Sequence, residues 1–267
     1  MKKLTRRNIL YIVLPIVVVV ALIILWEVLV NTLSIPRYIL PAPKAVWDAL
    51  LKYSDWLYSN MLYTLQQIMV GYALTIAVSI PLAVAVTYSS VLDRTLYPIM
   101  VVLQLIPKVA IAPLFIVWFG FGSLPKVLMV FLLSFFPLVV NSILGFKSIN
   151  HRLLYMARSI TDSEFRTFWM IRLPWALPSI FAGLRISIAF AVVGAVVGEF
   201  VGSDRGLGYL LLRANGLMLT DLLFACLIVL SLLGIGLYLM ITLLERIVMP
   251  WNVFKKELTK SGGAATM

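Results

Sequence analysis

The sequence contains a single cysteine, Cys226, and a single histidine, His151. One cysteine cannot form a disulfide within the chain, and one thiol with one imidazole cannot supply a Cys/His metal site, so we expect neither a disulfide framework nor a bound metal. Cys226 lies inside an apolar run and is predicted to be a small buried residue. His151 lies outside every long apolar run, which excludes a Ser–His catalytic pair within one.

Charged residues are also scarce: they make up 12% of the chain, whereas apolar residues make up 62% and the mean hydropathy is +1.03. A globular core of 267 residues could not hide this much apolar surface, so a lipid bilayer must be the main solvent. We therefore predict an all-α integral membrane protein. The net charge of +11 is better explained by membrane topology and anionic lipid headgroups than by nucleic acid, and we expect no nucleic acid partner.

Six segments are apolar enough, and long enough, to cross a membrane, which takes about 20 residues as a helix. They form a single transmembrane domain over residues 1–260, and a short polar tail follows at 261–267. The first segment follows four basic residues, but it is too long for a secretory signal and lacks a small-residue cleavage site, so we expect it to be retained. The predicted spans are Ile9–Val30, Met61–Thr87, Tyr97–Trp118, Leu124–Phe146, Pro174–Phe200 and Leu222–Leu244.

The distribution of Lys and Arg predicts the orientation of these spans. Six spans leave both termini on one side, and fourteen of the 22 basic residues lie in the segments on that side, against six on the other. Because basic residues in short loops favour the cytoplasm, both termini and the loop at 147–173 are predicted to be cytoplasmic. On the opposite side, Trp47, Trp56 and Tyr58 follow a proline-rich stretch and predict an interfacial helix, or alternatively a surface that gathers substrate.

The loop at 147–173 is basic and amphipathic, although it lies between two strongly apolar spans. Its apolar residues recur at helical spacing, so we expect one short helix there and a second one, capped by Asp162 or Ser163, that ends at Pro174. Such a pair would present a rigid knob to a soluble partner; the alternative is a helix that lies on the inner leaflet. The residues on the apolar face of the first helix are Leu153, Met156, Ala157 and Ile160.

This loop resembles the cytoplasmic loop of ABC importer permeases, which reads Glu-Ala-Ala, three residues, Gly, nine residues and Ile-x-Leu-Pro. Ala157 stands at the last Ala position, and nine residues separate Thr161 from the closing motif. The sequence departs from the pattern at Tyr155, Met156 and Thr161, where Glu, Ala and Gly are usual. A β-branched Thr resists the positive φ that Gly allows, so the two short helices need not meet at the usual angle. The resemblance assigns the ATPase-coupling role to Arg152, Tyr155, Met156, Ala157, Arg158, Thr161, Ile171, Leu173 and Pro174.

The resemblance covers roughly Pro41–Trp251, including ILPAPKAVWDAL, IPKVAIAPLFIVWFGFG, LPWALPSIFAGLRISIAFA and GEFVGSDRGLGYLL. These segments are similar to the branch of permeases that serves nitrate, bicarbonate, taurine, aliphatic sulfonates and some vitamin precursors. The resemblance implies a type I ABC importer-like fold in a bacterial or archaeal inner membrane, acting as a homodimer with two ATPase subunits and a periplasmic or extracellular solute-binding protein. The chain has no Gly-x-x-x-x-Gly-Lys-Ser/Thr motif, so ATP and Mg would bind the partner and this chain would be no enzyme.

Two cations inside the predicted spans, Lys108 and Arg185, are candidates for the translocation path. A charge near the bilayer centre costs on the order of 2.5 to 3.5 kcal/mol, so it is usually functional or paired. At about 1.5 Å of rise per helical residue, both residues lie at roughly the middle of the membrane. Two cations at this depth would suit a small anionic solute. The alternative is that each pairs with a carboxylate or with carbonyl groups freed by a nearby proline. An ion-gradient-driven secondary transporter would show similar charges, but usually also an internal repeat, which we do not find.

Four further candidates for the path are Gln104, Pro107, Pro113 and Glu199. The two prolines interrupt the helical ladder of the third span, which is tolerated where backbone is buried in protein or faces water. Glu199 lies near the outer end of the fifth span and is predicted to contact the binding protein or to remain solvated. In the same span three glycines recur every four residues and predict close helix packing, with pore lining as the alternative. They are Gly194, Gly198 and Gly202.

Overall fold

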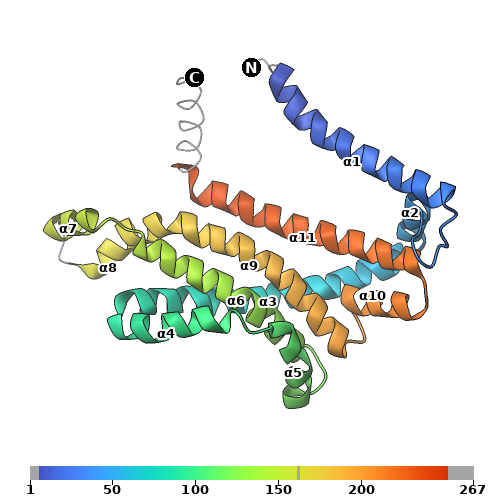
Figure 1. The fold of residues 1–267 in the computed structure, drawn as a ribbon. Coiled ribbons are helices and arrows are strands. Elements are labelled where there is room, and N and C mark those ends of the chain that lie inside the picture. The colour runs from blue at the N-terminus through green and yellow to red at the C-terminus, as the bar shows by residue number, and fades with distance from the viewer. Residues whose placement is uncertain (1–5, 161–162, 252–267) are drawn as a thin grey trace.

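The computed structural model describes residues 6–160 and 163–251, and within these ranges all regular structure is helical. Figure 1 shows long helices lying side by side, with short helices at both ends of the bundle. The elements are α1 (Arg6–Thr32), α2 (Pro43–Lys52), α3 (Ser54–Tyr88), α4 (Ser90–Leu103), η1 (Lys108–Ile111), α5 (Ala112–Phe119), α6 (Leu124–Lys147), α7 (His151–Ile160), α8 (Glu164–Thr167), the π-helix η2 (Phe168–Arg172), α9 (Leu173–Gly202), α10 (Leu207–Gly216) and α11 (Thr220–Val248).

Five of these helical stretches are long and apolar enough to cross a membrane, and α4 with η1–α5 makes a sixth span if the bent pair counts as one. The all-α membrane fold is therefore confirmed. The predicted start of the third span at Tyr97 is wrong, and the interruption expected at its prolines takes the form of a sharp bend. Its first helix begins at Ser90, and the two parts meet at 86° around a break. Pro107 explains the break, because it has no N–H to donate and disfavours helical backbone at the residue before it.

The centre of the bundle is formed by α3, α6 and α9. These helices pack closely because α3 and α9 each place a glycine against α6. A Cβ added to Gly71 of α3 would lie 2.5 Å from the Cβ of Val130, and one added to Gly194 of α9 would lie 2.8 Å from the Cα of Val130. Between α3 and α6 the hydroxyls of Thr75 and Ser134 are 2.7 Å apart and both are buried. Small residues and hydroxyl pairs are the means by which helices associate where apolar burial gives no advantage over lipid.

This packing predicts opposite signs for two alanine substitutions. Gly194→Ala is expected to lower the thermal midpoint of the detergent-solubilised protein, because its Cβ would meet the backbone of Met129 and Val130 at 2.8 Å. Gly236→Ala in α11 is the matched control, since no atom lies within 4 Å of its added Cβ and alanine favours helix by about 0.5–1 kcal/mol. Fluorescence-detected size exclusion after heating measures both midpoints. Equal losses in both variants would contradict close packing at Gly194.

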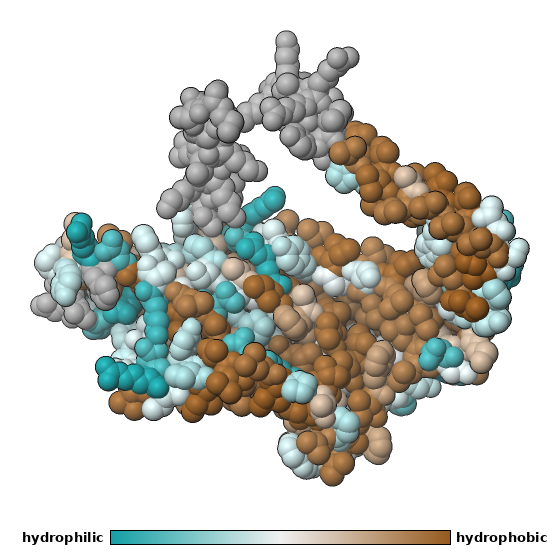
Figure 2. Space-filling model, in the orientation of Figure 1, coloured by the Kyte–Doolittle hydropathy of each residue, from teal (hydrophilic) through white to brown (hydrophobic). Residues whose placement is uncertain are grey.

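One helix, α1, lies away from the others along most of its length (Figure 1). Its contact with the bundle is near its end, where the Trp26 ring lies 5.7 Å from the Phe224 ring of α11. From Val13 onward its side chains are almost all exposed, and the surface there is mostly hydrophobic (Figure 2). A helix that is apolar on every side belongs in lipid or against another apolar surface.

The two ends of the bundle differ in chemistry. One end carries α2 and α10, and the opposite end carries α7 and α8, where hydrophilic residues gather (Figures 1 and 2). The interfacial helix predicted after the prolines corresponds to α2, which buries Val46 and Ala49 and exposes Trp47. Trp56 and Tyr58, by contrast, belong to the first turns of α3 and are exposed.

Candidate functional site

The loop at 147–173 forms α7, α8 and η2, and the second of its predicted helices begins as expected. The Ser163 hydroxyl accepts a hydrogen bond from the Arg166 N–H at 3.4 Å, and α8 starts at Glu164. The prediction that this helix ends at Pro174 is wrong, since α8, η2 and α9 run on as one helical stretch from Glu164 to Gly202. Pro174 has no N–H to donate to the preceding turn, and the π-helical turn just before it lets the helix continue.

Large apolar side chains project from this segment into solvent, although it is the polar end of the molecule. We call them the tip residues: Tyr155, Met156, Phe165, Trp169 and Met170. Tyr155 is 71% exposed and Phe165 75%. A cluster of exposed aromatic and Met side chains marks a surface that another protein or a membrane covers. Arg152 is exposed beside them; Thr161 lies outside the described residues, as do the side chains of Ala157 and Arg158.

The tip segment is anchored to the ends of the central helices by aromatic contacts. Phe168 of η2 stacks on Phe146 of α6, with ring centroids 5.9 Å apart, and approaches Tyr88 of α3 at 6.4 Å. The guanidinium of Arg172 lies over the Tyr88 ring at 4.6 Å. Ile171, Leu173 and Pro174 are half-buried in the same region. A force applied to the tip would therefore reach α3, α6 and α9 together.

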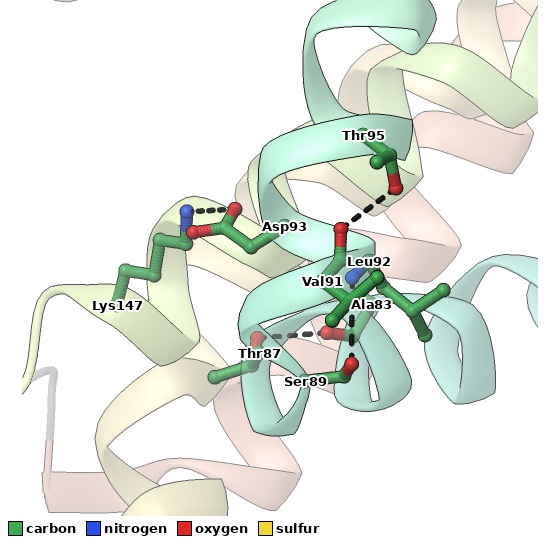
Figure 3. A network of polar contacts seen from close by, with 8 residues as sticks. All are labelled: Ala83, Thr87, Ser89, Val91, Leu92, Asp93, Thr95 and Lys147. Atoms are coloured by element: carbon green, nitrogen blue, oxygen red, sulfur yellow. Dashed lines mark hydrogen bonds and ion pairs between the residues drawn. The ribbon is translucent and has the colours of Figure 1, made fainter.

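A second set of contacts ties α4 to α6 at this end of the bundle (Figure 3). The Lys147 ammonium forms an ion pair with Asp93 and lies over the Tyr97 ring at 4.8 Å. The Ser89 hydroxyl caps α4 by accepting from the Leu92 N–H at 3.3 Å. The first turn of α4 is thereby held beside the last turn of α6, next to the tip segment.

The break between α4 and η1 borders an open cavity of about 450 Å³, part of whose lining, Phe190 included, is exposed on the surface of the chain. Of the six candidates for the translocation path, Gln104 and Lys108 line it, while Pro107, Pro113, Arg185 and Glu199 do not. The Lys108 ammonium donates to the Gln104 carbonyl at 2.9 Å and lies 4.8 Å from the centroid of the Phe136 ring. The remaining lining residues are Val109, Leu133, Phe136, Pro137, Val140, Asn141, Ile186, Phe190 and Val193.

Arg185 has a partner within the chain. Its guanidinium forms an ion pair with Glu245 of α11, one residue beyond the predicted end of the sixth span. The side chain therefore reaches toward the end of α11, rather than standing unpaired at mid-membrane. This is the carboxylate pairing that was the alternative to a place in the path.

Glu199 is neither solvated nor at an outer surface, so that prediction is wrong. Its side chain is 1% exposed; Oε1 accepts from the Thr64 hydroxyl at 2.8 Å and Oε2 from the Gly208 N–H at 2.7 Å. The Leu207 N–H donates to the Thr64 oxygen at 2.8 Å. These N–H groups belong to the first turn of α10, so the carboxylate caps that helix from a neighbouring one. A helix that starts after Gly206 with no cap of its own was the sequence signal for such an acceptor.

The three glycines of α9 all face other helices. The added Cβ of Gly198 would lie 2.9 Å from the Lys126 Cα of α6, and that of Gly202 would lie 2.3 Å from the Ile116 Cδ1 of α5. With Gly194 against α6, the stripe meets protein rather than an open channel. Sequence reasoning missed the aromatic and amide residues of the cavity, Phe136, Asn141 and Phe190, because each reads as part of an ordinary apolar span.

Similar proteins were found for nearly the whole chain. Residues 76–249 match the family described as binding-protein-dependent transport system inner membrane component. The formylaminopyrimidine transport permease protein of Halalkalibacterium halodurans is 36% identical, with 86% of this chain and 92% of the relative covered. The taurine transport system permease protein of Escherichia coli is 29% identical and covers 87% of each chain. The family match includes the tip segment and the residues that line the cavity.

A solved structure has the same fold. The inward-facing MetNI methionine ABC transporter includes a chain that matches with a TM-score of 0.58 at 17% identity, covering 72% of this chain and 97% of that one. At this identity the likeness concerns the fold alone. A family match over more than half of the sequence, relatives of matching length and a type I importer fold agree with one another. The chain accordingly belongs to the binding-protein-dependent inner membrane components, and it is a multi-pass permease subunit of an ABC importer.

Proposed function

We propose that two copies of this chain form the membrane pathway of an ATP-driven importer and that each copy docks on one cytoplasmic ATPase through its tip residues. The observation that carries this proposal is the exposed apolar tip, which is anchored by aromatic contacts to α3 and α6 and is continuous with α9. Exposed aromatic side chains on a rigid support are the usual anchors of a protein interface.

The arrangement supports a simple coupling scheme. ATP and Mg²⁺ bind the partner subunits, and closure of the ATPase pair moves the two tips together. Because α8, η2 and α9 are one helical stretch, a displacement of the tip tilts a helix that lines the cavity beside Lys108. The pathway then alternates between its two openings, driven by the different affinity of ATP for the two states.

The orientation follows from the same interface. A tip that contacts a cytoplasmic ATPase places the α7–α8 end of the bundle, and with it both termini, in the cytoplasm, as the Lys and Arg distribution predicts. The opposite end, which carries α2 and α10, then faces outward and receives the solute-binding protein. The named relatives transport a formylaminopyrimidine and taurine. We therefore propose a small organic solute as the cargo of this chain.

Native mass spectrometry of the tagged protein, gently purified from its own membranes, tests this proposal. The expected result is a complex of two copies of the chain with two copies of an ATPase. In a separate transport assay, uptake is expected to depend on ATP. Recovery of the chain without an ATPase after crosslinking, together with uptake that follows an ion gradient, would favour a secondary transporter and contradict the proposal.

A further inference from the structure

Lys108 is half-buried in the bundle and, unlike Arg185 and Lys126, has no carboxylate beside it. Arg185 pairs with Glu245, and Lys126 donates to the Tyr63 hydroxyl at 3.1 Å and lines the same pocket as Glu199. Across residues 6–160 and 163–251, no carboxylate lies within ion-pair distance of Lys108. Its ammonium has three donors, of which the Gln104 carbonyl takes one.

The lack of a carboxylate partner costs free energy at the position that Lys108 occupies. The cavity that it lines spans Leu133–Asn141 of α6, which is the middle of a membrane-crossing helix. A cation there is normally paired or takes part in transport, because the surrounding medium solvates it poorly. The two unused donors are therefore suited to an anion that arrives from outside the chain.

The rest of the cavity wall is apolar and partly aromatic. Phe136 and Phe190 are among its lining residues, aliphatic side chains cover most of the remainder, and Gln104 and Asn141 supply amides. The Asn141 amide nitrogen donates one hydrogen bond to the Pro137 carbonyl at 2.7 Å, so the polar groups of the wall are limited to the Lys108 ammonium and the two amides. A sugar or another many-hydroxyl solute would lose its hydrogen bonds with water here and find few replacements.

The size of the cavity excludes the smallest anions as a good fit. Its volume of about 450 Å³ lies in the range of sites that hold small organic molecules, roughly 300–1,000 Å³. A planar inorganic anion is closer to the size of a water molecule, whose share of liquid volume is about 30 Å³. It would leave most of the apolar wall uncovered.

From these observations we infer that the cavity between α4, η1, α6 and α9 is a binding site for the transported solute, and that this solute is an organic anion with a planar aromatic ring. Its anionic oxygen binds the Lys108 ammonium, and its ring lies against Phe136 and Phe190. The inference rests on the proposed function, because it takes the solute through this bundle. It narrows the cargo to aromatic carboxylates, sulfonates or related anions, in place of nitrate, bicarbonate or an aliphatic sulfonate.

The test uses the purified complex with its ATPase in nanodiscs and measures saturation-transfer NMR from the protein to a probe. Benzoate is the aromatic anion, benzyl alcohol its neutral counterpart, and taurine the aliphatic sulfonate. We expect benzoate to bind above the level of empty nanodiscs, at least tenfold more weakly in Lys108→Met than in wild type, and with most of its affinity kept in Lys108→Arg. Benzyl alcohol, which has no anionic group, is expected to bind more weakly than benzoate and to be insensitive to Lys108→Met. Taurine is expected to bind more weakly than benzoate because it has no ring.

ATP hydrolysis by the same samples separates the two proposals. A complex that hydrolyses ATP but binds benzoate equally in wild type and Lys108→Met would overturn the assignment of this site and leave the importer function intact. Tighter binding of taurine than of benzoate, dependent on Lys108, would overturn the aromatic class. Loss of the ATPase from the wild-type preparation would instead contradict the proposed function. Phe190→Leu provides a second variant, for which we expect weaker benzoate binding than in wild type.

Discussion

Replacing Tyr155 and Phe165 by aspartate is expected to remove the ATPase from the purified complex while leaving the permease folded. Both side chains are more than two thirds exposed, so the substitutions take no packing from the bundle. At a protein interface, however, loss of a buried aromatic anchor typically costs about 2 kcal/mol or more, which weakens binding roughly 30-fold for each residue. Two charges placed in the same apolar contact add a desolvation cost. The measurement is the amount of ATPase that co-purifies with the tagged chain.

Leu217→Asp with Met218→Asp is the matched control, because these residues are equally apolar and exposed but follow α10 at the opposite end. Met218 has a φ of 55°, a backbone conformation that Asp tolerates better than most residues. The control is expected to keep the ATPase. If the Tyr155/Phe165 double variant keeps it too, with an unchanged ratio of subunits, then the tip lies on the inner leaflet and the ATPase binds elsewhere.

Hydropathy predicted the existence of the spans well, because length and apolarity are properties of a local stretch of sequence. Five predicted spans correspond to long helices of the structure. The bend in the third one was not predicted, although Pro107 and Pro113 were recognised as interruptions. A proline predicts that the hydrogen-bond ladder of a helix is interrupted. The direction in which the chain continues depends on what the next helix packs against. Here α5 packs against α6 and α9, and the axis turns by 86°.

The environments of the charged residues were harder to predict, because their partners are distant in the sequence. Glu199 was expected to be exposed, since a carboxylate at the end of a span usually is. It is instead buried against Thr64, 135 positions away in the chain, and caps α10 from a neighbouring helix. Arg185 and Glu245 are separated by 60 positions. In both cases hydropathy identified a charge in an unusual place, and only the packing of helices identified its partner.

The ion pair between Arg185 and Glu245 predicts a distinct pattern of stabilities. Their side chains are 23% and 11% exposed, so removal of one partner leaves the other charge largely buried. Glu245→Leu or Arg185→Met alone is expected to destabilise the protein by about 3 kcal/mol, the lower end of the range for breaking a buried pair, because the guanidinium keeps some contact with solvent. The double variant is expected to regain most of this loss, since an apolar pair of similar size leaves no unpaired charge. Unfolding midpoints in detergent measure all three variants.

Uptake by the same variants decides between the pairing and a place in the translocation path. If the pairing is the whole role of Arg185, the double variant transports solute at close to the wild-type rate per folded complex. If Arg185 also binds the solute, uptake stays low in every variant that lacks it, including the double variant whose stability has recovered. Stability and transport change together in the first case and separate in the second. Lys108 is expected to show the opposite behaviour: Lys108→Met should weaken solute binding without a loss of stability, because it has no ion-pair partner to leave behind within the described part of the chain.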